Sequence, residues 1–158
     1  CGYESRLHYF SDWIHDNEQK GFVKDITREL GGIEIQKKIN FMSTHSSAYK
    51  QLKNDSLMIN KIIETENALS SRKLFYIPKD SVAAIEPQLS EGMIVGITSA
   101  VDGLDIAHVG FLVRKDGQIR LLHASSDEGK IVVSTKSLSE YLSGNKKQTG
   151  IVVIKLNN

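Results

Sequence analysis

The sequence has only one cysteine, Cys1, which stands at its first position. A single cysteine cannot form a disulfide within the chain, so cysteine usage indicates no redox compartment. No apolar run approaches the roughly 20 residues that a membrane-spanning helix needs, which argues against a membrane span. Internal repeats, low-complexity tracts and Pro/Gly-rich linkers are also missing. Because 158 residues is near the usual size of one domain, we predict a single domain over residues 1–158.

The sequence also has no excess of charge of one sign. Its 20 lysines and arginines nearly cancel 19 aspartates and glutamates, and no basic block stands out along the chain. This balance argues against nucleic acid or an anionic membrane surface as the main partner.

The chain opens on Cys1 rather than on methionine and carries no signal peptide. We expect this start to be a processed or truncated end, so that an export signal could have been lost with the missing part. Three interpretations of Cys1 stay open: a truncation scar, the site of a bacterial lipid anchor, and a free nucleophilic thiol.

The first third of the chain has the pattern of helices. Apolar residues in segment 3–21 recur at spacings of three and four, and Gly21 follows as a stop. Segment 31–42 starts with Gly-Gly and alternates imperfectly, which favours a strand after a turn. Helices are predicted over 46–52 and 55–71, the second with a cap at Asp55 or Ser56. The apolar face of that second helix is formed by Met58, Ile59, Ile62, Ile63 and Leu69.

From residue 74 onward, short runs rich in β-branched residues alternate with turn signals. The runs are LFYIP, MIVGITS, IAHVGFLV, QIRLLHAS, KIVVST and GIVVIKL, and one short helix, KSLSEYLSG, interrupts them. Helices followed by an antiparallel sheet are typical of the α+β class.

Two of these runs form a hairpin that carries two histidines. Asp116-Gly117 is typical of a two-residue type I′ turn, which makes Lys115 face Gln118. In that register Gly110 faces His123, and His108 is a diagonal neighbour of His123 on the same face. We expect the small Gly110 to leave open space where His123 points. The core is predicted on the other face, which carries Val109, Phe111, Val113, Leu122 and Ala124.

Two paired imidazoles suit nucleophilic catalysis. A neutral imidazole can activate a thiol or hydroxyl and then protonate the leaving group. It works best when a third polar group fixes its tautomer, so His108 is the candidate base and His123 its orienting partner. In an alternative interpretation the histidines simply satisfy each other or the backbone. A zinc site is the weaker interpretation, since two histidines need a third ligand and only Asp105 or Asp127 is near in sequence.

The motifs "GLDIAHVGF", "LLHASS" and "GKIVVS" resemble the second half of NlpC/p60-type cysteine peptidases, the papain-like enzymes of bacterial cell-wall turnover. The upstream motifs "GYESRLHYFSDWI", "INFMSTH" and "YIPK" resemble one branch of them, the N-acetylmuramoyl-L-alanine amidase-like proteins. The resemblance implies a papain-like α+β domain in which His108 is the base and His123 the third member of the triad. It implies hydrolysis of an amide in peptidoglycan, between N-acetylmuramic acid and L-alanine or nearby in the stem peptide, with no metal or organic cofactor.

The chain departs from that family at the nucleophile. In the family, the cysteine lies at the start of a helix upstream of the segment that resembles "GYESRLHYFSDWI", where a helix N-terminus lowers the pKa of the thiol. Here Cys1 adjoins that segment directly. The chain is then the C-terminal part of a longer enzyme, a non-catalytic muropeptide-binding or regulatory derivative, or an enzyme in which Cys1 is the nucleophile. The implied place of action is the bacterial cell envelope.

Four further residues are candidates for substrate binding. Arg6 could bind a carboxylate of the peptide stem through two parallel hydrogen bonds. Tyr9 and Trp13, at helical spacing from Arg6, could stack on a sugar face, or they could simply pack an amphipathic helix. Ser125 follows His123 closely and is expected to hydrogen-bond near His108 rather than to act as a nucleophile, because no Gly-x-Ser-x-Gly elbow is present.

Overall fold

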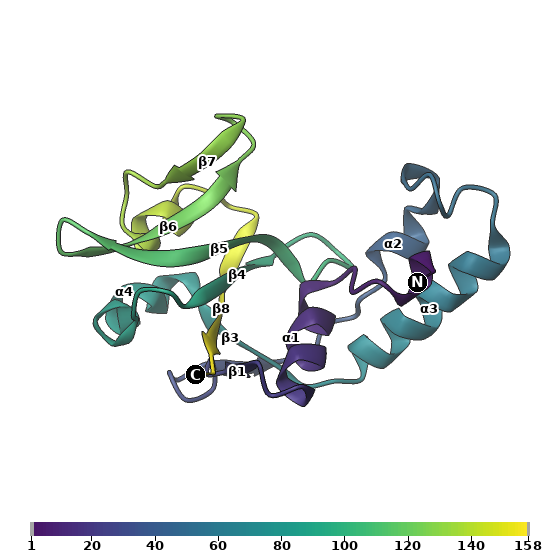
Figure 1. Cartoon of the computed structure of the whole chain (residues 1–158), viewed down its shortest axis with the longest axis horizontal. Coiled ribbons are helices and arrows are strands. Elements are labelled where there is room, and N and C mark those ends of the chain that lie inside the picture. Colours follow the sequence, from purple (N-terminus) through teal and green to yellow (C-terminus); the bar gives the residue numbers. More distant parts are fainter. Residues whose placement is uncertain (1, 158) are drawn as a thin grey trace.

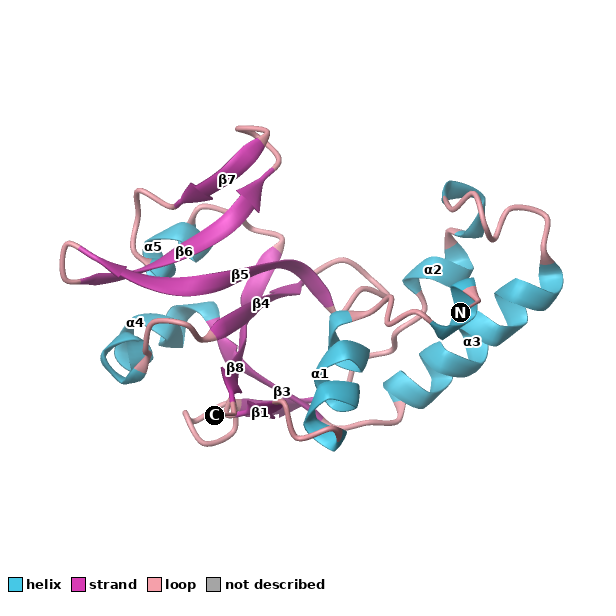
Figure 2. Ribbon diagram, viewed as in Figure 1, coloured by secondary structure: helices cyan, strands magenta, loops and turns pink. Residues whose placement is uncertain are grey.

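The computed structural model of the chain describes residues 2–157. Its secondary structure is mapped in Figure 2. The helices are α1 (Phe10–Gln19), α2 (Phe41–Thr44), α3 (Ser56–Ser70), α4 (Val82–Ile85) and α5 (Leu138–Ser143). The strands are β1 (Val23–Asp25), β2 (Ile33–Ile35), β3 (Leu74–Pro78), β4 (Ile94–Ser99), β5 (Ile106–Lys115), β6 (Gln118–Ser125), β7 (Lys130–Val133) and β8 (Gln148–Leu156). Short 3-10 turns occupy Tyr3–Ser5, Ser46–Ala48, Lys79–Ser81 and Glu86–Gln88.

The strands form one open, antiparallel sheet. Its order is β2-β3-β8-β4-β5-β6-β7, and β1 pairs with the C-terminal end of β8. The last strand of the chain is therefore near the middle of the sheet, where its apolar residues 151–154 are buried. The predicted α+β class with a mainly antiparallel sheet is confirmed.

The helices are distributed around this sheet in two groups. Helices α2 and α3 lie at one end of the molecule with α1 between them and the sheet, while α4 and α5 lie at the other end, near the hairpin β5–β6 (Figure 1). The first group has its own apolar cluster, which includes Tyr9, Ile39 and Ile62. Helices α4 and α5 pack on the sheet in the largest cluster, with Leu138 and Leu142. Among residues 2–157, no helix has both the length and the hydropathy to cross a membrane.

The hairpin β5–β6 has the register that the sequence predicts. Asp116 and Gly117 have positive φ angles of 52° and 76°, as a type I′ turn requires. Lys115 pairs with Gln118, and the same register continues to Phe111 and Leu122. The turn therefore sets which residues of the two strands share a face.

The face of the hairpin that is buried differs from the prediction. Leu112 and Leu121 are fully buried beneath α4 and α5, whereas Phe111 is 48% exposed and Val109 38% exposed. The histidines thus lie on the core side of the hairpin, and the expected core face is partly open. Both faces of the hairpin are apolar, so alternation alone could not identify the covered one; the packing of α4 and α5 decides it.

The open space expected at Gly110 is also absent. A Cβ atom there would lie 2.7 Å from Leu121 Cδ1 and 2.7 Å from the carbonyl oxygen of Leu122. The glycine accommodates the Leu121 side chain rather than a ligand.

Several early elements are shorter than predicted or of another type. Helix α1 begins only at Phe10, and both Arg6 and Tyr9 have extended backbone. The strand expected over 31–42 ends at Ile35, and the helix expected over 46–52 is only a 3-10 turn. The strand β1 was not predicted, because its three residues are too few to show a period.

The cap that the sequence predicts at the start of α3 is confirmed. The Asp55 side chain accepts a hydrogen bond from Met58 N at 2.9 Å and starts α3, as expected. On the predicted apolar face of α3, Ile62 and Leu69 are buried, but Ile63 is 37% exposed. Ser137 and Glu140 form a reciprocal capping box at the start of α5.

The covered face of the hairpin can be tested with two neighbouring residues. Leu112→Ala should lower the free energy of unfolding by about 2–5 kcal/mol, because it removes a fully buried side chain. Phe111→Ala should cost about 1 kcal/mol or less, because that ring is half exposed. Urea unfolding followed by circular dichroism measures both. A larger loss from Phe111→Ala than from Leu112→Ala would contradict the assignment of the faces.

Candidate active site

The strongest candidate site is the pair His108 and His123. His108 Nε2 and His123 Nδ1 lie 2.8 Å apart, a hydrogen bond between side chains 15 residues apart in sequence. The rings are almost perpendicular, at 87°. His123 is 8% exposed and its ring also meets Tyr141 of α5 edge-on, whereas His108 is only half-buried. His123 is therefore the fixed partner and His108 the accessible one.

The hydrogen bond leaves the other nitrogen of His108 available. Among residues 2–157, nothing hydrogen-bonds to His108 Nδ1. If His108 Nε2 carries the proton and donates it to His123 Nδ1, His108 Nδ1 presents a lone pair and can act as a base. The imidazolium that forms when His108 takes a second proton keeps the same donor–acceptor pair. His123 can therefore orient His108 in both protonation states.

The surroundings favour a neutral His108. Burial lowers the pKa of His108 below its usual 6.5, and the positive charge that His123 can carry lowers this pKa further. A neutral imidazole is the form that can accept a proton from a nucleophile at neutral pH.

His108 lies where two surface hollows of about 300 Å³ each meet. One, which we call the Tyr9 hollow, lies beside residues 104–109 at the start of β5. Its other lining residues, which we call its far wall, are His8, Tyr9, Phe10, Phe41, Met42 and Tyr49. The other, the His123 hollow, is lined by His123, Ser125, Ser126, Asp127, Tyr141, Asn145, Lys147 and Gln148, among others. Leu104, Ala107 and His108 line both. A substrate that spans both hollows would pass over His108.

A buried hydrogen-bond network holds the wall of the Tyr9 hollow. The Tyr9 hydroxyl donates to Glu66 Oε1 of α3 at 2.7 Å and accepts from Met42 N of α2 at 2.9 Å. Glu66 Oε1 also accepts from Ser43 N at 3.0 Å. Burial and the nearby Glu66 carboxylate raise the pKa of Tyr9 far above its usual value, so its hydroxyl remains protonated. These bonds also explain why segment 41–44 is helical, since they engage its first backbone N–H groups.

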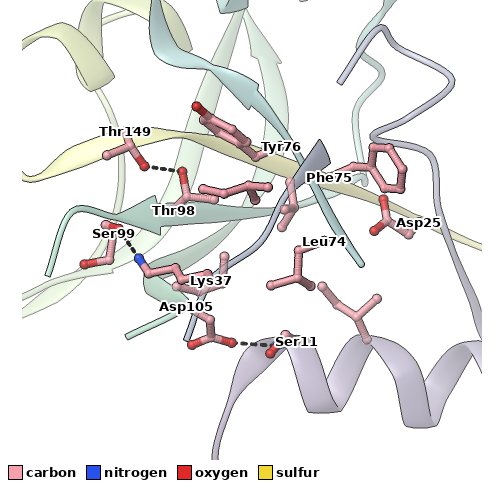
Figure 3. A pocket seen from close by; sticks show the side chains of 14 residues that line it. Ser11, Asp25, Lys37, Leu74, Phe75, Tyr76, Thr98, Ser99, Asp105 and Thr149 are labelled. Carbon is pink, nitrogen blue, oxygen red and sulfur yellow. Dashed lines mark hydrogen bonds between the residues drawn. The ribbon is translucent and has the colours of Figure 1, made fainter. Parts of the chain in front are cut away.

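A second set of contacts anchors the start of the strand that carries His108. Asp105, which is 4% exposed, accepts a hydrogen bond from Ser11 N in the first turn of α1 at 2.8 Å. Figure 3 shows this bond beside a small, mainly apolar cavity of about 50 Å³, into which Lys37 also projects. Lys37 Nζ donates to the carbonyl oxygen of Ser99. Asp105 therefore fixes α1 against β5, and it also lines the Tyr9 hollow together with His108.

The structure distributes the other candidate residues over different places. Tyr9 is 4% exposed, with its hydroxyl engaged and its side chain lining the Tyr9 hollow. Ser125 lines the His123 hollow, and its hydroxyl accepts from Glu128 N at 3.2 Å. Arg6 is exposed against the ring of Tyr3 and lines neither hollow, and Trp13 stacks on Phe10 at 5.2 Å. Cys1 lies outside the described residues. The roles of all five stay predictions.

Sequence reasoning missed the residues that long-range packing brings to the hollows. Phe41 and Tyr49 reach the Tyr9 hollow, and Tyr141 and Gln148 reach the His123 hollow. None carries a local motif, so only the tertiary structure identifies them. No cluster of three or more histidine, cysteine, aspartate or glutamate side chains suited to a metal ion occurs within residues 2–157.

Fold and site together define an α+β protein with a paired-histidine cleft, and comparison with known proteins gives its family. A model described as AmiA-like, N-acetylmuramoyl-L-alanine amidase-like, matches residues 1–151. The chain belongs to this family of amidase-like proteins. No curated protein matches the sequence.

Solved structures agree with this family. A crystal structure of an N-acetylmuramoyl-L-alanine amidase from Bacteroides uniformis is 38% identical, with a TM-score of 0.95 over 100% of this chain and 67% of its own. A Bacteroides fragilis protein provisionally called a xylanase is 39% identical, with a TM-score of 0.92 over 98% of this chain and 68% of its own. A Legionella pneumophila protein at 21% identity shares the fold alone, with a TM-score of 0.67 over 100% of this chain and 64% of its own.

The lowered pKa of His108 predicts two linked effects of pH. The His108 imidazole should titrate below pH 6.5, which an NMR titration of its ring protons measures, with the signal assigned by its loss in His108→Ala. Between that pKa and 6.5 the unfolded chain binds a proton that the folded chain does not, so stability should fall as the pH drops through this window. A midpoint at or above 6.5 would contradict the burial argument.

Proposed function

We propose that this chain acts as a peptidoglycan hydrolase with a cysteine nucleophile and His108 as the base. The bond cleaved is the amide between N-acetylmuramic acid and L-alanine of a muropeptide, or a nearby amide of the stem peptide. Family membership supports this class of reaction. The observation that carries the proposal is the 2.8 Å hydrogen bond between His108 Nε2 and His123 Nδ1 at the junction of two hollows.

The proposed reaction has two steps, and His108 takes part in both. His108 Nδ1 takes the proton of the thiol, and the thiolate attacks the carbonyl carbon of the scissile amide. His108 then gives the proton to the departing L-alanyl amine, which leaves a thioester on the cysteine. Water, deprotonated by His108, hydrolyses the thioester and frees the thiol and the carboxylic acid. His123 holds the His108 ring in place through both steps.

The nucleophile in this proposal is either Cys1 or a cysteine in a segment that precedes residues 1–158. The second arrangement makes this chain the C-terminal part of a longer amidase-like domain of the NlpC/p60, papain-like type. The chain spans 67% of the Bacteroides uniformis protein, which is therefore long enough to hold such an additional segment. We place the protein outside the cytoplasm, at the bacterial cell envelope, where Cys1 could also carry a lipid anchor.

A second candidate function is a non-catalytic module that binds muropeptides. The absence of any cysteine from residues 2–158 of the sequence favours it over catalysis by this chain alone. Both hollows would then serve binding or regulation without turnover.

Turnover of a muramyl peptide tests the hydrolase directly. Release of the L-alanyl amine should fall about 10²- to 10⁴-fold in His108→Ala, because the base is lost. The loss in His123→Ala should be clearly smaller, because a base is still present. His15→Ala, which changes an exposed histidine outside both hollows, serves as the matched control.

The outcomes separate the two candidate functions. Turnover that survives both Cys1→Ser and His108→Ala would end the cysteine-hydrolase proposal. Equal and mild losses of turnover in the two histidine variants would indicate that the pair has only a structural role. Binding of the muramyl peptide by the unaltered chain without any turnover would favour the binding module.

A further inference from the structure

The two hollows beside His108 differ in chemistry. The far wall of the Tyr9 hollow is built mainly from aromatic side chains, and the polar groups of two of them already have partners within the chain. The Tyr9 hydroxyl bonds Glu66, and His8 Nε2 lies 2.8 Å from the carbonyl oxygen of Tyr3. What this hollow offers a ligand is ring surface, above all the half-buried ring of Tyr49.

The His123 hollow offers hydrogen-bonding groups instead. It is lined by the hydroxyls of Ser125 and Ser126, the carboxylate of Asp127, the amide of Asn145 and the ammonium of Lys147. Ser126, Asp127 and Lys147 are exposed at its mouth. Such a mixture of acceptors, donors and both signs of charge suits a peptide, which carries amide donors and acceptors as well as carboxylates.

Gln148 provides an independent sign that the His123 hollow takes a ligand. This residue, at the start of β8, is 7% exposed, and its Oε1 is buried without a hydrogen-bond partner among the described residues. A buried acceptor without a partner is unfavourable, and a ligand that donates an N–H would relieve this cost.

We propose that a muropeptide binds across His108 in one orientation, an inference that rests on the proposed function. The stem peptide lies in the His123 hollow, where Gln148 Oε1 accepts a hydrogen bond from a peptide N–H. The saccharide lies in the Tyr9 hollow, with a sugar face against the ring of Tyr49. The scissile amide, which joins the two halves, is thereby placed over His108, the titratable residue among the three that line both hollows.

Binding of separate fragments tests this orientation without requiring turnover. The probes are the peptide L-Ala-γ-D-Glu-L-Lys, free N-acetylmuramic acid, and N-acetylmuramyl-L-alanyl-D-isoglutamine, titrated calorimetrically or by NMR. Gln148→Leu should lower the affinity for the peptide about 3- to 10-fold, because one neutral hydrogen bond is lost. Its affinity for the saccharide should not change. Gln148→Glu, which keeps an acceptor at Oε1, should retain more of the peptide affinity.

The saccharide arm uses a matched pair at one position. Tyr49→Ala should lower the affinity for N-acetylmuramic acid about 5-fold and leave the affinity for the peptide unchanged. Tyr49→Phe, which keeps the ring, should bind both fragments as the unaltered chain does. Thermal unfolding of each variant confirms that the fold is retained.

The outcomes distinguish the orientation from the function on which it rests. Suppose that N-acetylmuramyl-L-alanyl-D-isoglutamine binds, but Gln148→Leu lowers the affinity for the saccharide or Tyr49→Ala lowers the affinity for the peptide. The orientation is then wrong, while the proposed function stands. Equal effects of each variant on both fragments overturn the orientation as well. If the unaltered chain neither binds nor cleaves N-acetylmuramyl-L-alanyl-D-isoglutamine, the proposed function fails and the orientation fails with it.

Discussion

The hydrogen bond between His108 Nε2 and His123 Nδ1 is the contact on which the account of this protein depends. It joins two strands through their side chains, and it engages Nε2 of His108, so that Nδ1 is the ring nitrogen left for a substrate or nucleophile. A histidine turned the other way would present the wrong atom to a nucleophile, whatever its pKa. Because His123 is packed against Tyr141, the orientation of the accessible ring is set by a residue that has little freedom to move.

The rest of the fold keeps this pair at the edge of a cleft. Asp105, just before β5, accepts from Ser11 N and so ties α1 to the strand of His108. Tyr9, just before α1, is tied through Glu66 to α3. Two buried carboxylates thus connect the helical end of the molecule to the sheet. The Tyr9 hollow exists because these ties hold the aromatic side chains of the helical end opposite β5.

How much the sequence could predict depends on whether a feature is encoded locally. The turn at Asp116-Gly117 sets the register of its own hairpin, so the pairing of His108 and His123 could be inferred from the turn alone. The strands expected at 74–78 and 118–125 have the bounds that were predicted, because each is bracketed by turn residues. These features need no knowledge of the rest of the chain.

The features that failed are decided by distant parts of the chain. The covered face of the hairpin depends on α4 and α5, which pack on Leu112 and Leu121. Helix α4 precedes the hairpin in the sequence, and α5 follows it. The lining of the hollows likewise depends on distant segments, since Tyr49 lines one hollow and Gln148 the other, about 100 residues further along the chain. The helix over 41–44 replaced an expected strand because Tyr9 and Glu66 bind its first backbone N–H groups. Periodicity in one segment carries no information about such partners.

The tautomer of His108 gives the sharpest test of its role as a base, because the measurement needs neither a substrate nor a nucleophile. A long-range ¹H–¹⁵N correlation spectrum at pH 7, with His108→Ala for assignment, reports which ring nitrogen carries the proton. The account predicts a proton on Nε2, shared with His123, and a bare Nδ1 that faces the cleft. A proton found on Nδ1 of His108 would contradict the account, since the ring would then offer a donor where a base is required.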